Sequence, residues 1–415
     1  MQRIGISKEL FRGDRSVWII FMLLCCFSIV EGFSATSTLA FRQASVFLPI
    51  VRHTSFLIAG FVWILVLTHT PYRFFSLGIL LMLVSVALLI LTFGTRWLSV
   101  FGTPFQPSEL GKLACIIYVA FLLSKREKFT NERTVKYICI GVGIVCALIL
   151  PFNLSTALIL GTVCFLMMFI GLIPLKKLGR LLFNLFIAAL LFSLLLGVIP
   201  ADILKQIFPR FVTWQNRIHT YIGLTKTSNE TQDTTNTYII PDENYQITHA
   251  KIAIARGGII GKGPGQSVQR DFLPQAFSDF IYAIIIEEVG VVGGIVVLVL
   301  YLMLLIRVVI IARRCEKLFP KYLVLGCGLL IVFQALVHMA VSVGFFPVTG
   351  QPLPLISRGG TSIVITCTYI GIILSVSHFG ANMSEEEEED EELENELEQA
   401  AIPAENPNLA IETES

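Results

Sequence analysis

The feature that most constrains this chain is a series of about ten apolar stretches, each close to the roughly 20 residues that an α-helix needs to cross a bilayer. They begin near Ser16, His53, Phe74, Leu110, Tyr137, Leu154, Leu181, Phe280, Tyr322 and Gly360. With 54% hydrophobic and 15% charged residues among its 415 positions, the chain is too apolar to fold in water as an ordinary globular domain. We therefore expect an all-α polytopic membrane protein, with its membrane domain over residues 16–378.

Lys and Arg are concentrated in alternate connections between these stretches. Most of them lie in residues 1–15, at Arg73, and in residues 125–136, 176–180 and 307–321. Because short loops rich in Lys and Arg stay in the cytoplasm, both termini are expected on the cytoplasmic side, and the first stretch is expected to be an uncleaved signal anchor. The basic residues are distributed between spans rather than gathered on one soluble face, which argues against nucleic acid as a partner.

The only sizeable loop, about residues 201–278, lies between the seventh and eighth stretches and is expected to be extracytoplasmic. Apolar residues at helical spacing predict an amphipathic helix over residues 203–214 at the membrane interface. A second apolar-periodic stretch covers residues 245–260. Between them, residues 225–236 are rich in Thr, Asn and Ser, which gives no reason to expect a packed core.

The C-terminal segment, residues 379–415, is expected to be a disordered cytoplasmic tail. Residues 385–414 hold 14 of the 30 acidic side chains and no Lys or Arg, and a run of like charges repels itself and stays solvated. A short helix or a docking segment that uses Leu393 and Leu397 is the alternative.

The nine cysteines lie in or beside apolar stretches, without a CxxC pair or a His spacing that would hold zinc. They are expected to be small buried residues, and no metal site is predicted. No cofactor is indicated, and the question of an assisting divalent cation stays open.

Four segments place polar residues, glycines and prolines at the outer ends of apolar stretches, where anchoring alone would not require them. The first, residues 105–113, puts Glu109 and Lys112 on one helix face, where they can pair; a self-neutralising helix start is the alternative. The second, residues 272–282, carries Asp279 at a helix start beside the large loop. This position suits a general base that takes a proton from a hydroxyl, although a helix cap is the alternative.

The third segment, residues 344–362, is a Gly- and Pro-rich re-entrant loop whose backbone amides, beside Arg358, can form an anion nest. The fourth, residues 261–265, contains Lys262 between glycines. It lacks the spacing of a nucleotide-binding P-loop, so a plain turn is the preferred interpretation.

Three of these motifs together resemble the SEDS family, which comprises the FtsW, RodA and SpoVE proteins. They are QPSELGKL at residues 106–113, LPQAFSDFIYA followed by EEVG within residues 273–290, and PVTGQPLPLISRGGTS at residues 347–362. The resemblance covers essentially residues 16–378 and implies the SEDS-type fold. It is closer to the division branch of the family than to the elongation branch.

The chain also departs from the family pattern. Residues 151–157 read PFNLSTA in place of the usual QPDLGTA, Thr349 replaces a Lys, and Arg358 replaces a Tyr. His338 and Ser342 stand at two positions that are usually Asn.

The resemblance implies a peptidoglycan glycosyltransferase that polymerises lipid II into glycan strands on the outer face of the bacterial inner membrane, at the division septum. The essential Asp of the family corresponds to Asp279, which would act as the general base. The candidate substrate contacts are Glu109, Lys112, Arg217, Gln246, Lys262, Asp271, Glu288, Ser357, Arg358, Gly359 and Gly360. The Lys and Arg side chains among them would hold the diphosphate.

The resemblance also implies partners, namely a single-span class B penicillin-binding protein similar to FtsI as transpeptidase and other membrane proteins of the divisome. Other functions stay open. A transporter that flips the same lipid-linked precursor would also place polar groups within the membrane, and a scaffold of a wall-synthesis complex would need no catalytic Asp. Within the family, an elongation polymerase of the RodA type is the alternative.

Overall fold

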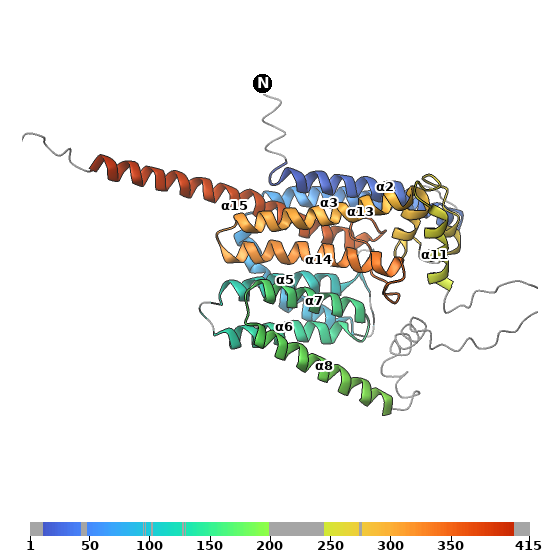
Figure 1. Ribbon diagram of the computed structural model, residues 1–415, viewed down its shortest axis with the longest axis horizontal. Helices are drawn as coiled ribbons and strands as arrows, with labels where there is room; N and C mark the ends of the chain where they lie inside the picture. Colours follow the sequence, from blue (N-terminus) through green and yellow to red (C-terminus); the bar gives the residue numbers. More distant parts are fainter. Residues whose placement is uncertain are drawn as a thin grey trace, which may run out of the picture.

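In this computed structural model, most of the long helices run close to parallel and form a bundle (Figure 1). The structure describes residues 11–42, 48–93, 95, 97–100, 103–126, 128, 130–198, 245–273 and 276–401. Three features of the sequence analysis lie outside these residues: Arg217, the predicted amphipathic helix over residues 203–214, and the polar stretch over residues 225–236.

A helix begins at or near the start of each predicted apolar stretch. These helices are α2 (Arg15–Arg42), α3 (Leu48–Thr68), the 3-10 helix η1 (Tyr72–Gly78) with α4 (Ile79–Leu91), α5 (Pro107–Ser124), α6 (Asn131–Ile149), α7 (Leu154–Ile170), α8 (Leu175–Val198), α13 (Ile281–Arg314), α14 (Leu318–Ser342) and α15 (Gly360–Ala401). In lipid, only a helix pairs all the backbone groups of a single segment internally. The expected all-α membrane architecture is confirmed.

Seven helical segments of the described chain are long and apolar enough to cross a membrane. They are Arg15–Ser34, Ile50–Thr68, Tyr72–Leu91, Pro107–Ser124, Ile281–Arg314, Leu318–Ser342 and Gly360–Gly380. Helix α7 is apolar but has 17 residues, and α6 and α8 occupy the other two predicted stretches. The total of about ten spans stays a prediction.

Helix α14 lies at the centre of the bundle, where it packs against α5, α7, α13 and α15, and α3 packs along α15. Glycine permits close approach between these helices. A Cβ on Gly326 of α14 would lie 2.7 Å from Ile116 Cγ2 of α5. Close packing matters here because lipid chains are as apolar as the helices, so burial from lipid provides little hydrophobic drive.

Two short strands precede α5 and form an antiparallel hairpin, β1 (Leu98–Val100) with β2 (Thr103–Phe105), in which Leu98 pairs with Phe105. The sequence analysis did not predict this hairpin, because strands of three residues are too short to show an alternating pattern.

The segment before α13 contains α11 (Tyr245–Gly257) and α12 (Gln269–Phe272). Helix α11 occupies most of the apolar-periodic stretch that begins at Tyr245, and it packs against α13. Ala250, Ala253, Leu273 and Phe280 belong to a small apolar core that is separate from that of the bundle. This small core supports the chain on either side of Asp279.

Helix α15 continues to Ala401, into the acidic C-terminal segment, and projects beyond the bundle (Figure 1). The disordered tail over residues 379–415 stays a prediction, with a short helix as its alternative. Glu, Leu, Gln and Ala are strong helix formers, and extension of a helix that is already nucleated adds one hydrogen bond per residue. Helix propensity and the added hydrogen bonds favour the helix, whereas repulsion between like charges opposes it. Residues 402–415 lie outside the described part.

Candidate functional site

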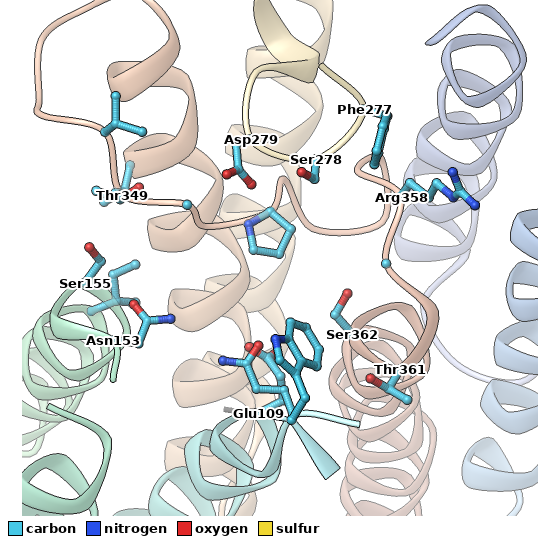
Figure 2. A pocket seen from close by; sticks show the side chains of 18 of the residues that line it. Glu109, Asn153, Ser155, Phe277, Ser278, Asp279, Thr349, Arg358, Thr361 and Ser362 are labelled. Atoms are coloured by element: carbon cyan, nitrogen blue, oxygen red, sulfur yellow. The ribbon is translucent and has the colours of Figure 1, made fainter. Parts of the chain in front are cut away.

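A cavity of about 920 Å³ lies at the end of the bundle that carries α11. Its walls come from α3, α5, α7, α11, α14, the start of α15, the β hairpin and two connecting segments, residues 277–279 and 346–359. Figure 2 shows Asp279 on one side of this pocket and Glu109 on the opposite side. Five of the predicted substrate contacts line the cavity with Asp279: Glu109, Gln246, Arg358, Gly359 and Gly360.

Asp279 lies just before α13, in a turn that follows α12. Its neighbour Phe280 is 1% exposed, whereas Asp279 itself is partly exposed and faces the cavity. A Cβ on Gly350 would lie 3.5 Å from Asp279 Oδ2, so the re-entrant loop passes directly beside the carboxylate. Asp279 is therefore held on the cavity wall rather than in the apolar core.

The segment of Asp279 is tied to the re-entrant loop by hydrogen bonds. Ser357 Oγ donates to Ser278 O at 2.7 Å, and Arg358 N donates to Phe277 O at 3.0 Å. Ser357 Oγ also accepts from Leu353 N at 2.7 Å and is buried. Ser357 was predicted to contact substrate. In this structure its hydroxyl joins two loops, and Ser357 does not line the cavity. Its role as a substrate contact stays a prediction.

Glu109 and Lys112 pair as predicted, with Nζ 2.9 Å from Oε1. Lys112 is 1% exposed and also donates from Nζ to Gln334 Oε1 at 2.8 Å, and Gln334 Nε2 donates to Pro352 O at 3.0 Å. Lys112 is not among the residues that line the cavity, and its role as a substrate contact stays a prediction. It supports the re-entrant loop through Gln334, while Glu109 lines the wall.

The re-entrant loop is held through its carbonyl oxygens by side chains of several helices. His338 Nδ1 lies 2.7 Å from Gln351 O, and the hydroxyls of Tyr301 and Ser28 donate to Pro354 O and Ile356 O. The predicted role was an anion nest of backbone amides. That role stays a prediction, because the contacts above use carbonyl oxygens and not amides. They make this loop a supported wall of the cavity, with Arg358 at its end.

Gln351 was not singled out by the sequence analysis. Its Nε2 donates to Thr156 Oγ1 at 2.8 Å and to Asn153 Oδ1 at 3.2 Å, which joins the loop to the start of α7. Asn153 and Ser155 line the cavity and are labelled in Figure 2. The signal in the sequence for this part of the site is the segment 151–157, which corresponds to a family motif but does not by itself show that it borders the cavity.

Two guanidinium groups, those of Arg52 and Arg358, line the cavity. Arg358 Cζ lies 5.3 Å from the centre of the Phe277 ring, and Figure 2 shows both side chains at the cavity margin. Burial, and then the charge of Arg52, lower the pKa of Arg358. Arg52 is not among the site residues expected from the sequence, because its proximity to Arg358 depends on how α3 packs beside α15.

The remaining predicted contacts lie away from the cavity. Lys262 and Asp271 are exposed, and Asp271 pairs with Arg270 at 3.5 Å. Glu288 is 1% exposed, and its carboxylate accepts from Gly265 N at 2.9 Å and Ser267 N at 3.2 Å. These internal donors occupy the carboxylate oxygens of Glu288, and its assignment to substrate binding stays a prediction.

The site combines a partly exposed carboxylate, two guanidinium groups and several neutral polar side chains in one cavity. A carboxylate at such a position can accept a proton from a hydroxyl. Planar guanidinium groups suit phosphate oxygens, because their N–H donors match the oxygens in pairs. The cavity is thus equipped for a ligand that carries hydroxyl and phosphate groups.

Residues 14–382 match the family of FtsW, RodA and SpoVE proteins, described as cell cycle proteins. This chain belongs to that family. It is 32% identical over 389 residues to the probable peptidoglycan glycosyltransferase FtsW of Geobacter metallireducens, with 89% of this chain and 96% of that protein covered. It is 28% identical over 396 residues to the Bacillus subtilis protein of the same name, with 90% and 93% covered.

Solved structures of the family share the fold. The crystal structure of Thermus thermophilus RodA matches with a TM-score of 0.60 at 22% identity, covering 88% of this chain and 96% of that one. A second solved structure concerns the structural coordination of polymerization and crosslinking by a peptidoglycan synthase complex. One of its chains matches with a TM-score of 0.65 at 22% identity, covering 89% of this chain and 98% of that one. The family resemblance predicted from three short motifs is confirmed.

Proposed function

We propose that this protein is a peptidoglycan glycosyltransferase that polymerises lipid II during cell division. The observation that carries the proposal is Asp279, held on the wall of a cavity of about 920 Å³, in a chain whose relatives are named probable peptidoglycan glycosyltransferases. The cavity and its charged groups supply what the reaction requires, which is one base and cations for the leaving group.

In the proposed reaction, the Asp279 carboxylate takes the proton from a hydroxyl of the acceptor sugar. The hydroxyl oxygen forms a bond to the anomeric carbon of the donor as the bond between that carbon and the diphosphate breaks. Undecaprenyl diphosphate leaves with the electron pair. Arg52 and Arg358, which line the cavity, would stabilise the negative charge on the diphosphate.

The proposed setting is the inner membrane, with the Asp279 end of the bundle outside the cell, both termini in the cytoplasm and the protein at the division septum. The Lys and Arg distribution between the spans supports this orientation. We further propose a class B penicillin-binding protein similar to FtsI as partner, together with other divisome membrane proteins. Support comes from the structural likeness to a chain of a peptidoglycan synthase complex.

The test is polymerisation of purified lipid II in detergent, with the partner transpeptidase present. Asp279→Asn keeps the shape of the side chain but removes the base, and we expect the rate to fall about 100-fold or more. Glu132→Gln is the control, because Glu132 is exposed at the start of α6 and outside the cavity, and it should keep the normal rate.

A normal rate for Asp279→Asn would rule out this carboxylate as the base. Glycan product in detergent would also separate a polymerase from a lipid transporter or a scaffold. Detergent leaves no membrane between two compartments, so transport cannot account for product.

A further inference from the structure

Helix α13 is broken at Gly290, which has φ 80° and ψ 179°. Such a residue interrupts the ladder in which each N–H bonds to the carbonyl four residues before it. The backbone groups freed at the break are paired with the chain that follows α11. These pairs are Lys262 N to Glu287 O at 3.0 Å, Gly263 N to Glu288 O at 2.8 Å, Val291 N to Gly258 O at 3.0 Å and Val292 N to Ile259 O at 3.3 Å.

Glycine is required on both sides of this contact because the two backbones touch. A Cβ on Gly257 would lie 2.0 Å from Ile286 O, and one on Gly261 would lie 2.3 Å from Glu288 O. A Cβ on Gly290 would lie 2.1 Å from Ile259 O. Gly261 therefore does more than form the plain turn that the sequence suggested. It lets the loop approach the break in α13 closely enough for their backbones to pair.

Two buried carboxylates bind the same loop a second time. Glu287 and Glu288 are each 1% exposed. Backbone N–H groups and hydroxyls supply their hydrogen bonds, from Gly265, Ser267, Val268, Gln269 and Ser34. Arg270 Nη1 lies 3.8 Å from Glu288 Oε1 and donates to Ser34 O at 3.1 Å, which ties the loop to α2.

We call this assembly the clasp: residues 257–263 paired with residues 286–292, together with the carboxylates of Glu287 and Glu288. The clasp closes the chain between them into a ring, and Asp279 lies on the part of the ring that faces the cavity. The ring is held elsewhere by the contacts of Ser357 and Arg358 with Ser278 and Phe277. The position of Asp279 is therefore set by attachments to the clasp and to the re-entrant loop.

We propose that the clasp is a positioning device for Asp279, and that Glu288 is a positioning residue rather than a substrate contact. This inference rests on the proposed function of Asp279 as the base. The physical reason is that an error of about 1 Å in the position of a reacting group costs about 100-fold in rate. A ring closed by buried backbone and carboxylate hydrogen bonds restricts such errors.

The test compares Glu288→Gln and Glu288→Ala with the unsubstituted protein in polymerisation with purified lipid II and the partner. Gln keeps one acceptor oxygen, whereas Ala keeps none. We expect kcat to fall about 10-fold for Gln and about 100-fold for Ala, while KM changes less than about threefold, because the cavity side chains are untouched.

Hydrogen exchange gives a readout that does not depend on activity. In Glu288→Gln, amides of residues 265–280 should exchange faster, while those of α5 and α14 stay protected. Gly290→Ala should show the same pattern, and Gly143→Ala is its control, because a Cβ on Gly143 meets nothing within 4 Å. If Gly290→Ala does not fold, the Glu288 variants decide the question.

Normal kcat in Glu288→Ala, or faster exchange over the whole bundle instead of the ring, would overturn the proposal. The proposed function is tested separately by Asp279→Asn. If that variant polymerises at the normal rate, Asp279 is not the base. The exchange experiment then still reports whether the clasp holds the ring.

Discussion

Two groups of buried carboxylates, Glu109 on the one hand and Glu287 with Glu288 on the other, are stabilised in different ways. Glu109 is paired with the ammonium of Lys112, and that pair borders the cavity. Glu287 and Glu288 instead accept hydrogen bonds mainly from backbone N–H groups and hydroxyls of one loop. A buried carboxylate can thus be stabilised by a neighbouring cation at the cavity wall. Alternatively, it can hold a loop in place by accepting hydrogen bonds from the backbone of that loop.

The largest expected effect comes from breaking the local pair. Lys112→Met leaves the Glu109 carboxylate without its cation and Gln334 Oε1 without its donor, so we expect a loss of about 3–5 kcal/mol in stability. Thermal unfolding in detergent, monitored by circular dichroism, would measure it. Lys177→Met is the control, since the pair of Lys177 with Glu132 is largely exposed and should contribute no more than about 1 kcal/mol. Equal effects for both variants would contradict the difference.

A smaller effect is expected when one carboxylate of the second group is neutralised. Glu287→Gln keeps an acceptor oxygen for the donors at Ser267 and Gln269 and loses one acceptor at Val268, so stability should fall by about 1–2 kcal/mol. The same unfolding measurement applies. A loss as large as that of Lys112→Met would show that charge, rather than hydrogen bonding, dominates in both groups.

The smallest effect is expected when both members of the local pair are made neutral. The double variant Glu109→Gln with Lys112→Met has no buried charge left to compensate, and its stability should lie within about 1 kcal/mol of the unsubstituted protein. A double-mutant cycle with the single variants would measure the coupling between the two side chains. Additive losses would mean that the pair does not interact energetically.

Hydropathy and short motifs predicted much of the fold and part of the site. Helices begin at or near each predicted stretch, and Asp279, Glu109, Arg358, Gly359 and Gly360 meet in one cavity as their motifs suggested. The helices and the motifs themselves depend on residues that are close together in the chain, whereas the meeting of the motifs in one cavity depends on the tertiary structure.

The contacts that the sequence did not reveal share one property, which is that they join residues far apart in the chain. Lys112 meets Gln334, more than two hundred positions away, and Glu288 meets Ser34 of α2. Arg52 joins the site only because α3 packs along α15. The break at Gly290 was not predicted either, because glycine is tolerated within apolar helices and its partner loop lies elsewhere in the sequence.

The sequence by itself determined the class of this protein. A segment in lipid must satisfy its own backbone, so an apolar run of sufficient length is enough to predict a helix. Only the tertiary structure decided which charged side chains face the cavity and which support it. That outcome depends on the competition of distant donors for each buried carboxylate, because a buried polar group is stable only where partners surround it.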